Sequence, residues 1–164
     1  MRKANYGKFP STKLTGMLVQ GWDSIISMLK EKMDARKVLA VDLYTGVYEE
    51  EVLDAFSKEF SGRVMNVRDL MKPEKEIQTL TERFMTEDVL FGYVTNLKLE
   101  DYLDADKVAV ARKQISEAKE TIVIIGTGAA VVAPQDAMVV YADMARWEIQ
   151  QRFRRHEVDR KSTR

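Results

Sequence analysis

Hydrophobic and polar positions along the chain follow two periods, one typical of strands and one typical of helices. Short β-branched runs predict buried strands, and longer runs with apolar residues three and four apart predict amphipathic helices. The predicted strands cover residues 38–42, 63–67, 121–125 and 138–141. The predicted helices cover residues 23–32, 49–60, about 74–85, about 107–119 with Asp106 as its cap, and about 145–156. This alternation favours an α/β fold with three layers, in which helices cover both faces of a mainly parallel sheet.

Two regions fit the alternation less well. Residues 14–19 are interpreted either as a short edge strand or as an extended arm, so that about residues 1–20 form an N-terminal arm or edge strand. Residues 86–106 contain turn residues and little periodicity, which predicts an irregular insertion above the sheet. No composition break divides the chain, so we expect a single domain over 1–164 that ends in a basic tail at 156–164.

The segment after the first predicted strand has the layout of a phosphate-binding loop but the opposite charge. A strand, a tight turn at Gly46 and a helix follow one another as they do where P-loop proteins hold polyphosphate. When the pattern G-x-x-x-x-G-K-[ST] is laid over this segment, its four defining positions are occupied by Leu43, Tyr48, Glu49 and Glu50. The glutamates at 49–51 satisfy the positive end of the helix dipole from within the chain and would repel a nucleotide phosphate.

Four loops should meet at the carboxyl ends of the predicted strands, where parallel α/β sheets bind their ligands. The candidate phosphate- or ligand-binding residues in them are Thr45, Gly46, Val47, Tyr48, Gly126, Thr127, Gly128, Arg146, Arg152, Arg154 and Arg155. The arginines could hold an anion by bidentate hydrogen bonds, or they could form a solvated face. Asp42 is expected to cap a helix or to polarise a neighbouring loop. We do not expect residues 129–134 to start a helix, because they lack the features of a helix N-terminus.

Composition narrows the possible functions. The chain of 164 residues carries 26 basic and 26 acidic residues, and no aromatic residues are interleaved with the basic ones, which argues against nucleic acid as a partner. It contains no cysteine, so disulfides and thiolate chemistry are excluded. No apolar run approaches the roughly 18 residues of a membrane span, and the start lacks the apolar core of a signal peptide. We therefore expect a cytoplasmic protein with no membrane partner, no metal and no cofactor.

The order of segments resembles the uridine kinase and phosphoribulokinase group of P-loop kinases. Strings at 124–128, 140–143 and 152–155 are similar to that group's strand before the lid, its final strand and its arginine-rich helix. In that family an aspartate after the second strand acts as the base, and Asp69 occupies the matching place as a weak catalytic candidate; otherwise it is a turn residue. The lysine, the magnesium-binding hydroxyl and the flexible glycines of the family are missing. The resemblance therefore implies a P-loop nucleoside-kinase-like fold with a degenerate phosphate loop.

A second resemblance covers nearly the whole chain. The strings at 8–13, 41–47, 91–95 and 141–152 are similar to the amino-terminal part of long bacterial proteins classed as mannose-6-phosphate isomerases. In those proteins a kinase-like domain precedes a cupin-type isomerase domain, which needs a zinc site of several ligands. This chain has one histidine, His156, so that site is not expected within it. The resemblance implies the front domain of such a protein, with the cupin-type domain as its partner if the gene continues.

Three functions remain open. The favoured one is an accessory, non-catalytic kinase-like domain of a mannose-6-phosphate isomerase, which can bind a phosphorylated ligand such as a sugar phosphate or a nucleotide. The first alternative is an active nucleoside or sugar kinase that grips phosphate through arginines, with Asp69 as its base. The second alternative is an interaction module without a ligand, such as a homodimerisation unit. Isomerisation by this chain alone is rejected, because the base and the electrophile of an aldose–ketose conversion are not assembled in it.

Overall fold

A parallel β-sheet forms the centre of the molecule. The computed structural model describes residues 11–13, 15–88 and 92–158. Its strands are β1 (Val38–Leu43), β2 (Arg63–Asn66), β3 (Ile122–Gly126) and β4 (Met138–Ala142). All neighbours pair in parallel, in the order β2-β3-β1-β4. The expected α/β class with a mainly parallel sheet is therefore confirmed, and the predicted strands agree with the observed ones to within two residues at each end.

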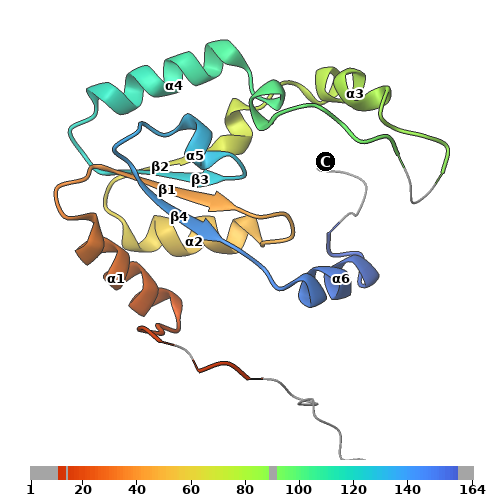
Figure 1. Ribbon diagram of the computed structural model, residues 1–164. Helices are drawn as coiled ribbons and strands as arrows, with labels where there is room; N and C mark the ends of the chain where they lie inside the picture. Colours follow the sequence, from red (N-terminus) through yellow and green to blue (C-terminus); the bar gives the residue numbers. More distant parts are fainter. Residues whose placement is uncertain (1–10, 14, 89–91, 159–164) are drawn as a thin grey trace, which may run out of the picture.

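Helices cover both faces of this sheet (Figure 1). The α-helices are α1 (Trp22–Met33), α2 (Glu49–Glu59), α3 (Glu74–Glu82), α4 (Ala105–Glu117), α5 (Ala129–Val132) and α6 (Arg146–Arg154). Two short 3-10 helices, η1 (Val67–Leu70) and η2 (Leu99–Tyr102), lie before α3 and before α4. The five predicted helices are all present, although α3, α4 and α6 end two or three residues earlier than expected.

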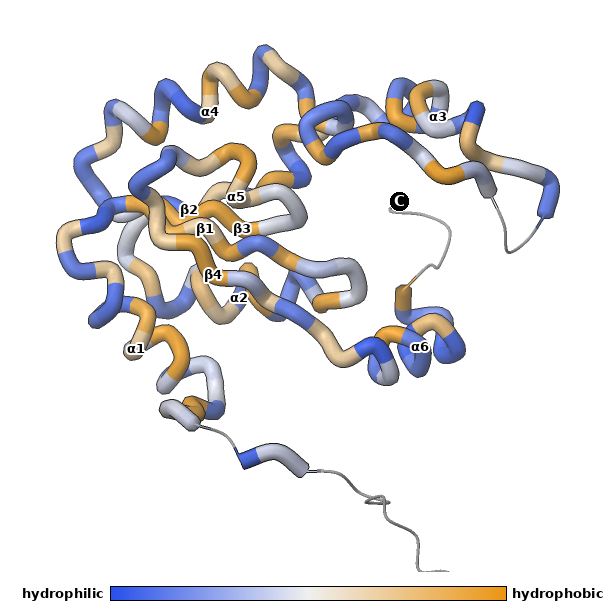
Figure 2. The backbone as a smooth tube through the Cα atoms, in the orientation of Figure 1, coloured by the Kyte–Doolittle hydropathy of each residue, from blue (hydrophilic) through white to orange (hydrophobic). Residues whose placement is uncertain are grey.

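Two hydrophobic cores explain why the central strands are continuous apolar runs. Along β1, Leu39 and Val41 face α1 and α2, whereas Val38 and Ala40 face α4 and α5. The buried residues of β3 divide between the two cores in the same way. A strand covered by helices on both faces needs apolar residues at every position, and Figure 2 shows this hydrophobic centre as a band along the strands.

The edges of the elements differ from the sequence predictions in three places. The helix predicted from 107 begins at Ala105, because the carboxylate of Asp104, and not that of Asp106, accepts hydrogen bonds from the amides of residues 106 and 107 at 3.0 and 3.1 Å. Within the predicted insertion, η2 forms and Leu103 pairs with Met71 in an isolated antiparallel bridge. Helix α3 ends at Glu82, since the next turn forms hydrogen bonds from Phe84 and Met85 to carbonyls three residues back.

Residues 15–20, which precede α1, do not join the sheet. Residues 15–20 contain neither helix nor strand, so the edge-strand interpretation is wrong for these residues and the alternative of an extended arm describes them. Met17 and Leu18 on this segment are 73% and 80% exposed. The basic tail predicted at 156–164 lies outside the described residues from position 159 onward.

Candidate functional site

The turn after β1 is tight and is covered by helix α6. Gly46 has a φ of 97°, which side chains disfavour, and the amide of Val47 donates to the carbonyl of Tyr44 at 3.1 Å to close the turn. A Cβ atom at Gly46 would lie 3.5 Å from Ile149 Cγ1 and 3.6 Å from Met144 Sδ. Side chains within α6 and just before it therefore cover the turn after β1.

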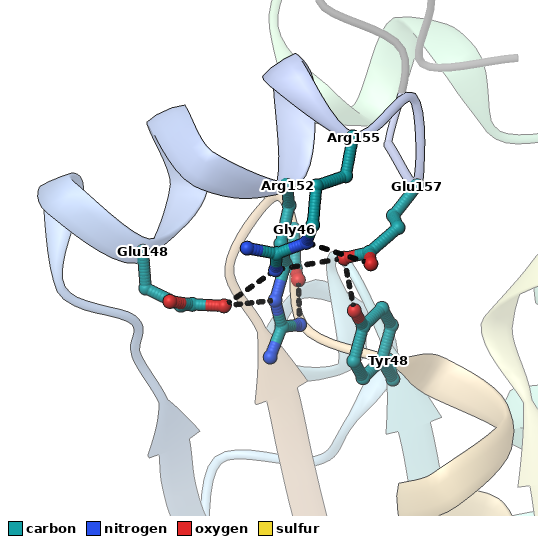
Figure 3. Close-up of polar contacts among 6 residues, drawn as sticks. All are labelled: Gly46, Tyr48, Glu148, Arg152, Arg155 and Glu157. Carbon is teal, nitrogen blue, oxygen red and sulfur yellow. Dashed lines mark hydrogen bonds and ion pairs between the residues drawn. The ribbon is translucent and has the colours of Figure 1, made fainter.

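Arg152 fastens α6 to the turn. Its Nη1 atom donates a hydrogen bond to the carbonyl of Gly46, and its Nε atom lies 3.3 Å from Glu148 Oε1. Its guanidinium carbon lies 3.6 Å from the centroid of the Tyr48 ring, which is a cation–π contact. The side chain is only 14% exposed. Figure 3 shows this arginine between the turn and α6, bonded to Gly46 and to Glu148.

A second carboxylate binds the aromatic residue at the start of α2. The Tyr48 hydroxyl donates to Glu157 Oε2 at 2.6 Å, and Arg155 donates to Glu157 Oε1 at 2.8 Å and to Glu148 Oε1 at 3.0 Å (Figure 3). The hydrogen bonds from Arg155 and Tyr48 lower the pKa of Glu157 to about 2. The hydrogen bonds from Arg155 and Arg152 lower the pKa of Glu148. At neutral pH both carboxylates are therefore ionised. We call the six residues Gly46, Tyr48, Glu148, Arg152, Arg155 and Glu157 the latch.

The first turn of α2 carries three glutamates that are all engaged by other parts of the chain. Glu49 Oε2 lies 3.0 Å from Arg68 Nη2, and Glu50 Oε1 lies 3.7 Å from Arg68 Nη1. Glu51 accepts a hydrogen bond from the indole of Trp22 at 2.9 Å. The other oxygen of Glu49 is buried without a hydrogen-bond partner. This end of α2 therefore holds negative charge from within the chain, as the sequence predicted, and a phosphate placed there would meet carboxylates.

The loop after β3 also has an internal anion. The carboxylate of Asp42, at the end of β1, accepts from the amide of Gly128 at 3.1 Å and from the amide of Ala130 at 2.9 Å. Gly128, with a φ of 88°, precedes α5, which begins at Ala129. Our expectation that no helix starts there is wrong, because a carboxylate from the neighbouring strand supplies the cap. Asp42 therefore acts on the neighbouring loop and the start of α5, and no side-chain cap is formed at α2, the helix that follows its own strand.

The structure brings together some of the candidate residues and separates others. Gly46 and Tyr48 contact Arg152 or Arg155 at the latch, and Thr45 and Val47 lie beside them in the same turn. Gly126, Thr127 and Gly128 lie in the adjacent loop, which is joined to β1 by a hydrogen bond from the Thr127 hydroxyl to the carbonyl of Leu43 at 3.0 Å.

Three other candidates lie apart from these contacts. Arg146 and Arg154 are exposed on α6, and the guanidinium carbon of Arg154 lies 5.9 Å from the Trp147 ring centroid. Asp69 is exposed on η1.

Several residues of the latch and its surroundings were not predicted from the sequence. Glu148 could have been found, because it lies four residues before Arg152 on one helix face, a spacing that favours ion pairs. Glu157 and Arg68 gave no such signal, because their partners Tyr48 and Glu49 are distant from them in the sequence.

Within the described residues, no group of three or more histidine, aspartate or glutamate side chains could hold a metal ion. None of the helices in the described ranges is long and apolar enough to cross a membrane.

The fold and the site define the class as an α/β parallel-sheet domain in which the turn after β1 is covered by the chain's own side chains. The chain belongs to the family described as "Domain of unknown function (DUF8485)", whose model matches residues 21–161. Neither the curated proteins nor the solved structures contain a match to this chain. The resemblance to P-loop kinases and to mannose-6-phosphate isomerases remains a prediction.

Proposed function

We propose that this chain is a non-catalytic accessory domain with a kinase-like layout, and that it serves a mannose-6-phosphate isomerase as the resemblance of its sequence implies. The latch is the observation that carries the non-catalytic part of this proposal. Arg152 contacts the carbonyl of the turn glycine, and Glu157 binds the hydroxyl of Tyr48. A domain that phosphorylates a substrate must instead leave these groups accessible to phosphate and to magnesium.

Charge supports the same conclusion independently of packing. The residues that replace lysine and the magnesium-binding hydroxyl are Glu49 and Glu50, and Arg68 only partly balances them. Two carboxylates at a helix N-terminus compete with a phosphate for the same amides and repel it by like charge. The domain would therefore contribute surface and rigidity to a larger assembly. The loops at the carboxyl ends of its strands would take no part in catalysis.

The kinase alternative loses two of its proposed phosphate-binding groups. Arg152 and Arg155 are both engaged by Glu148, and each has a further partner within the chain. Arg146 and Arg154 remain exposed. These two arginines, with Trp147 between them on the outer side of α6, favour a weaker second candidate, which is binding of a sugar phosphate or nucleotide on the surface of the helix.

A thermal-shift panel with ATP, ADP, mannose 6-phosphate and fructose 6-phosphate, each with and without magnesium, tests the proposal. A bound ligand raises the melting temperature by mass action. We expect no rise with nucleotide. The variant Glu49→Lys combined with Glu50→Thr restores the two missing residue types, and we expect it to remain unresponsive because α6 still covers the turn. A saturable rise with ATP and magnesium in the wild type, together with phosphate transfer, would overturn the proposal.

If only sugar phosphates raise the melting temperature, Arg146→Ala combined with Arg154→Ala separates the two candidates. Loss of the rise in this variant would place the ligand on the outer side of α6 and would leave the latch account intact. Arg68→Ala is a matched control, because Arg68 is also an exposed arginine but lies on η1 and pairs with α2.

A further inference from the structure

We infer that the edge of β4 binds the N-terminal arm of a second copy of this chain, so that two copies exchange arms. The arm is defined here as residues 15–20. This inference does not depend on the proposed function, because neither the arm nor the outer edge of β4 takes part in the latch.

The first observation is an apolar sheet edge. β4 is the last strand in the order of the sheet and pairs only with β1 among the described strands. Val139 and Tyr141 are 54% and 57% exposed, although Met138, Val140 and Ala142 pack against the core on the other face. An edge strand with exposed apolar side chains is a template for pairing with another strand, and proteins usually protect such an edge with charges or a covering element.

The second observation is an apolar segment without a place in its own sheet. Met17 and Leu18 are 73% and 80% exposed, and the sequence of this segment favours a strand. Figure 1 shows that the chain runs from the start of α1 to the outside of the body, away from the sheet. Six arm residues and the five residues of β4 have matching lengths, about 17–20 Å when extended. The arm could therefore cover the full edge of another molecule.

Charge selects the arm over a second β4 strand as the occupant. Residues 15–20 carry no charged side chain and follow Lys13, whereas residues 134–145 contain two acidic residues, Asp136 and Asp143, and no basic residue. If two β4 edges met antiparallel, their aspartates would approach one another. An uncharged arm avoids this repulsion between like charges.

Exchange between two copies follows from the geometry of the arm. A strand added along β4 gains main-chain hydrogen bonds, and its side chains pack beside Val139 and Tyr141 on the same face of the sheet. Each copy has one arm and one free β4 edge, so reciprocal exchange satisfies both molecules and closes a two-fold dimer. Unreciprocated exchange would leave one arm and one edge exposed at each end of a chain of molecules.

The mass in solution gives the first test. By light scattering coupled to gel filtration, the full-length chain should have twice the 18.9 kDa of a single copy. Val139→Lys should weaken the dimer by about tenfold or more, because it places a charge on the strand edge. Met17→Asp combined with Leu18→Asp should do the same. Val110→Lys is the matched control, because Val110 is 57% exposed on α4, and it should leave the dimer unchanged.

Cysteine cross-linking gives the second test, which does not depend on the stability of any variant. The chain has no cysteine, so introduced ones report only on the chosen pair. A mixture of Leu18→Cys and Val139→Cys chains should form a disulfide-linked dimer, whereas Leu18→Cys mixed with Val110→Cys should not.

A monomeric wild type overturns the inference, as does equal disruption by the Val110→Lys control. Efficient cross-linking of Val139→Cys with itself would indicate pairing of two β4 edges. A cross-link within one chain carrying both cysteines, without dimer, would indicate that the arm folds back on its own sheet. Each of these last two results also contradicts exchange.

Discussion

The carboxyl end of β1 and the outer edge of β4 lie in the same sheet but differ in how they are covered. At the carboxyl end of β1, arginines and glutamates bind one another around Gly46, and Asp42 occupies the amides of the next loop. At the edge of β4, apolar side chains are exposed. The difference indicates that the usual ligand-binding end of an α/β sheet is closed here by internal polar contacts, whereas the edge retains capacity for another chain.

Removing Arg152 should have the largest effect on the closed end. Arg152→Ala deletes a hydrogen bond to Gly46, an ion pair with Glu148 and the contact with Tyr48. Because the side chain is largely buried and its hydrogen bonds are charge-assisted, we expect a loss of about 2–3 kcal/mol in the free energy of unfolding. Urea denaturation measures this loss. Arg154→Ala on the exposed side of the same helix is the control and should change the stability by less than about 0.5 kcal/mol. Equal effects of the two substitutions would show that Arg152 does not fasten α6.

Removing the internal anion of the neighbouring loop should have the next largest effect. Asp42→Ala leaves the amides of Gly128 and Ala130 without their acceptor, and we expect a loss of about 1–2 kcal/mol in the free energy of unfolding. Asp42→Asn retains one acceptor oxygen and should lose less. If both variants are as stable as the wild type, Asp42 does not stabilise the start of α5.

Acid should weaken the latch in a defined pH range. The folded-state pKa of Glu157 is about 2, below its ordinary value of 4.5, so its stabilising effect is complete above about pH 4.5 and declines as the pH falls toward 2. The melting temperature of the wild type should therefore fall more steeply across this range than that of Glu157→Gln. Parallel curves for the two proteins would contradict the assigned role of Glu157.

The smallest effect on folding is expected at the open edge. Val139→Thr replaces one exposed methyl group by a hydroxyl and keeps the β-branched shape. We expect a change of less than about 0.5 kcal/mol in the free energy of unfolding, measured at a protein concentration low enough to exclude dimers. A larger loss would mean that the edge of β4 is covered within the single chain, and the contrast between the two regions would disappear.

The sequence predicted the periodic parts of the fold better than the site. The strands and longer helices were found because their apolar positions recur at local spacings. Helix α5 was missed because its cap, Asp42, precedes it by more than 80 residues in the sequence. The cap of α4 was placed two residues too late, since Asp104 and Asp106 are equally suitable cap residues in the local pattern.

The sequence showed that glutamates occupy residues 49–51, where a phosphate-binding loop has basic and hydroxyl residues. It did not show that other side chains of the chain bind these glutamates. Arg68 and Trp22, which bind them, lie on other elements and are close to them only in the folded chain. The same holds for Glu157, which reaches Tyr48 across more than 100 residues of sequence. Long-range polar contacts of this kind have no periodic signature, so the latch could be recognised only in the folded chain.

Amide chemical shifts of Gly46 and of Glu49, Glu50 and Glu51 during a titration with ATP and magnesium test the central claim most directly. If the chain's own side chains fill the phosphate position, these amide signals remain where they are up to a large excess of nucleotide. Saturable shifts that are centred on these four amides would contradict the account, because they would place a phosphate where Arg152, Tyr48 and the three glutamates now lie.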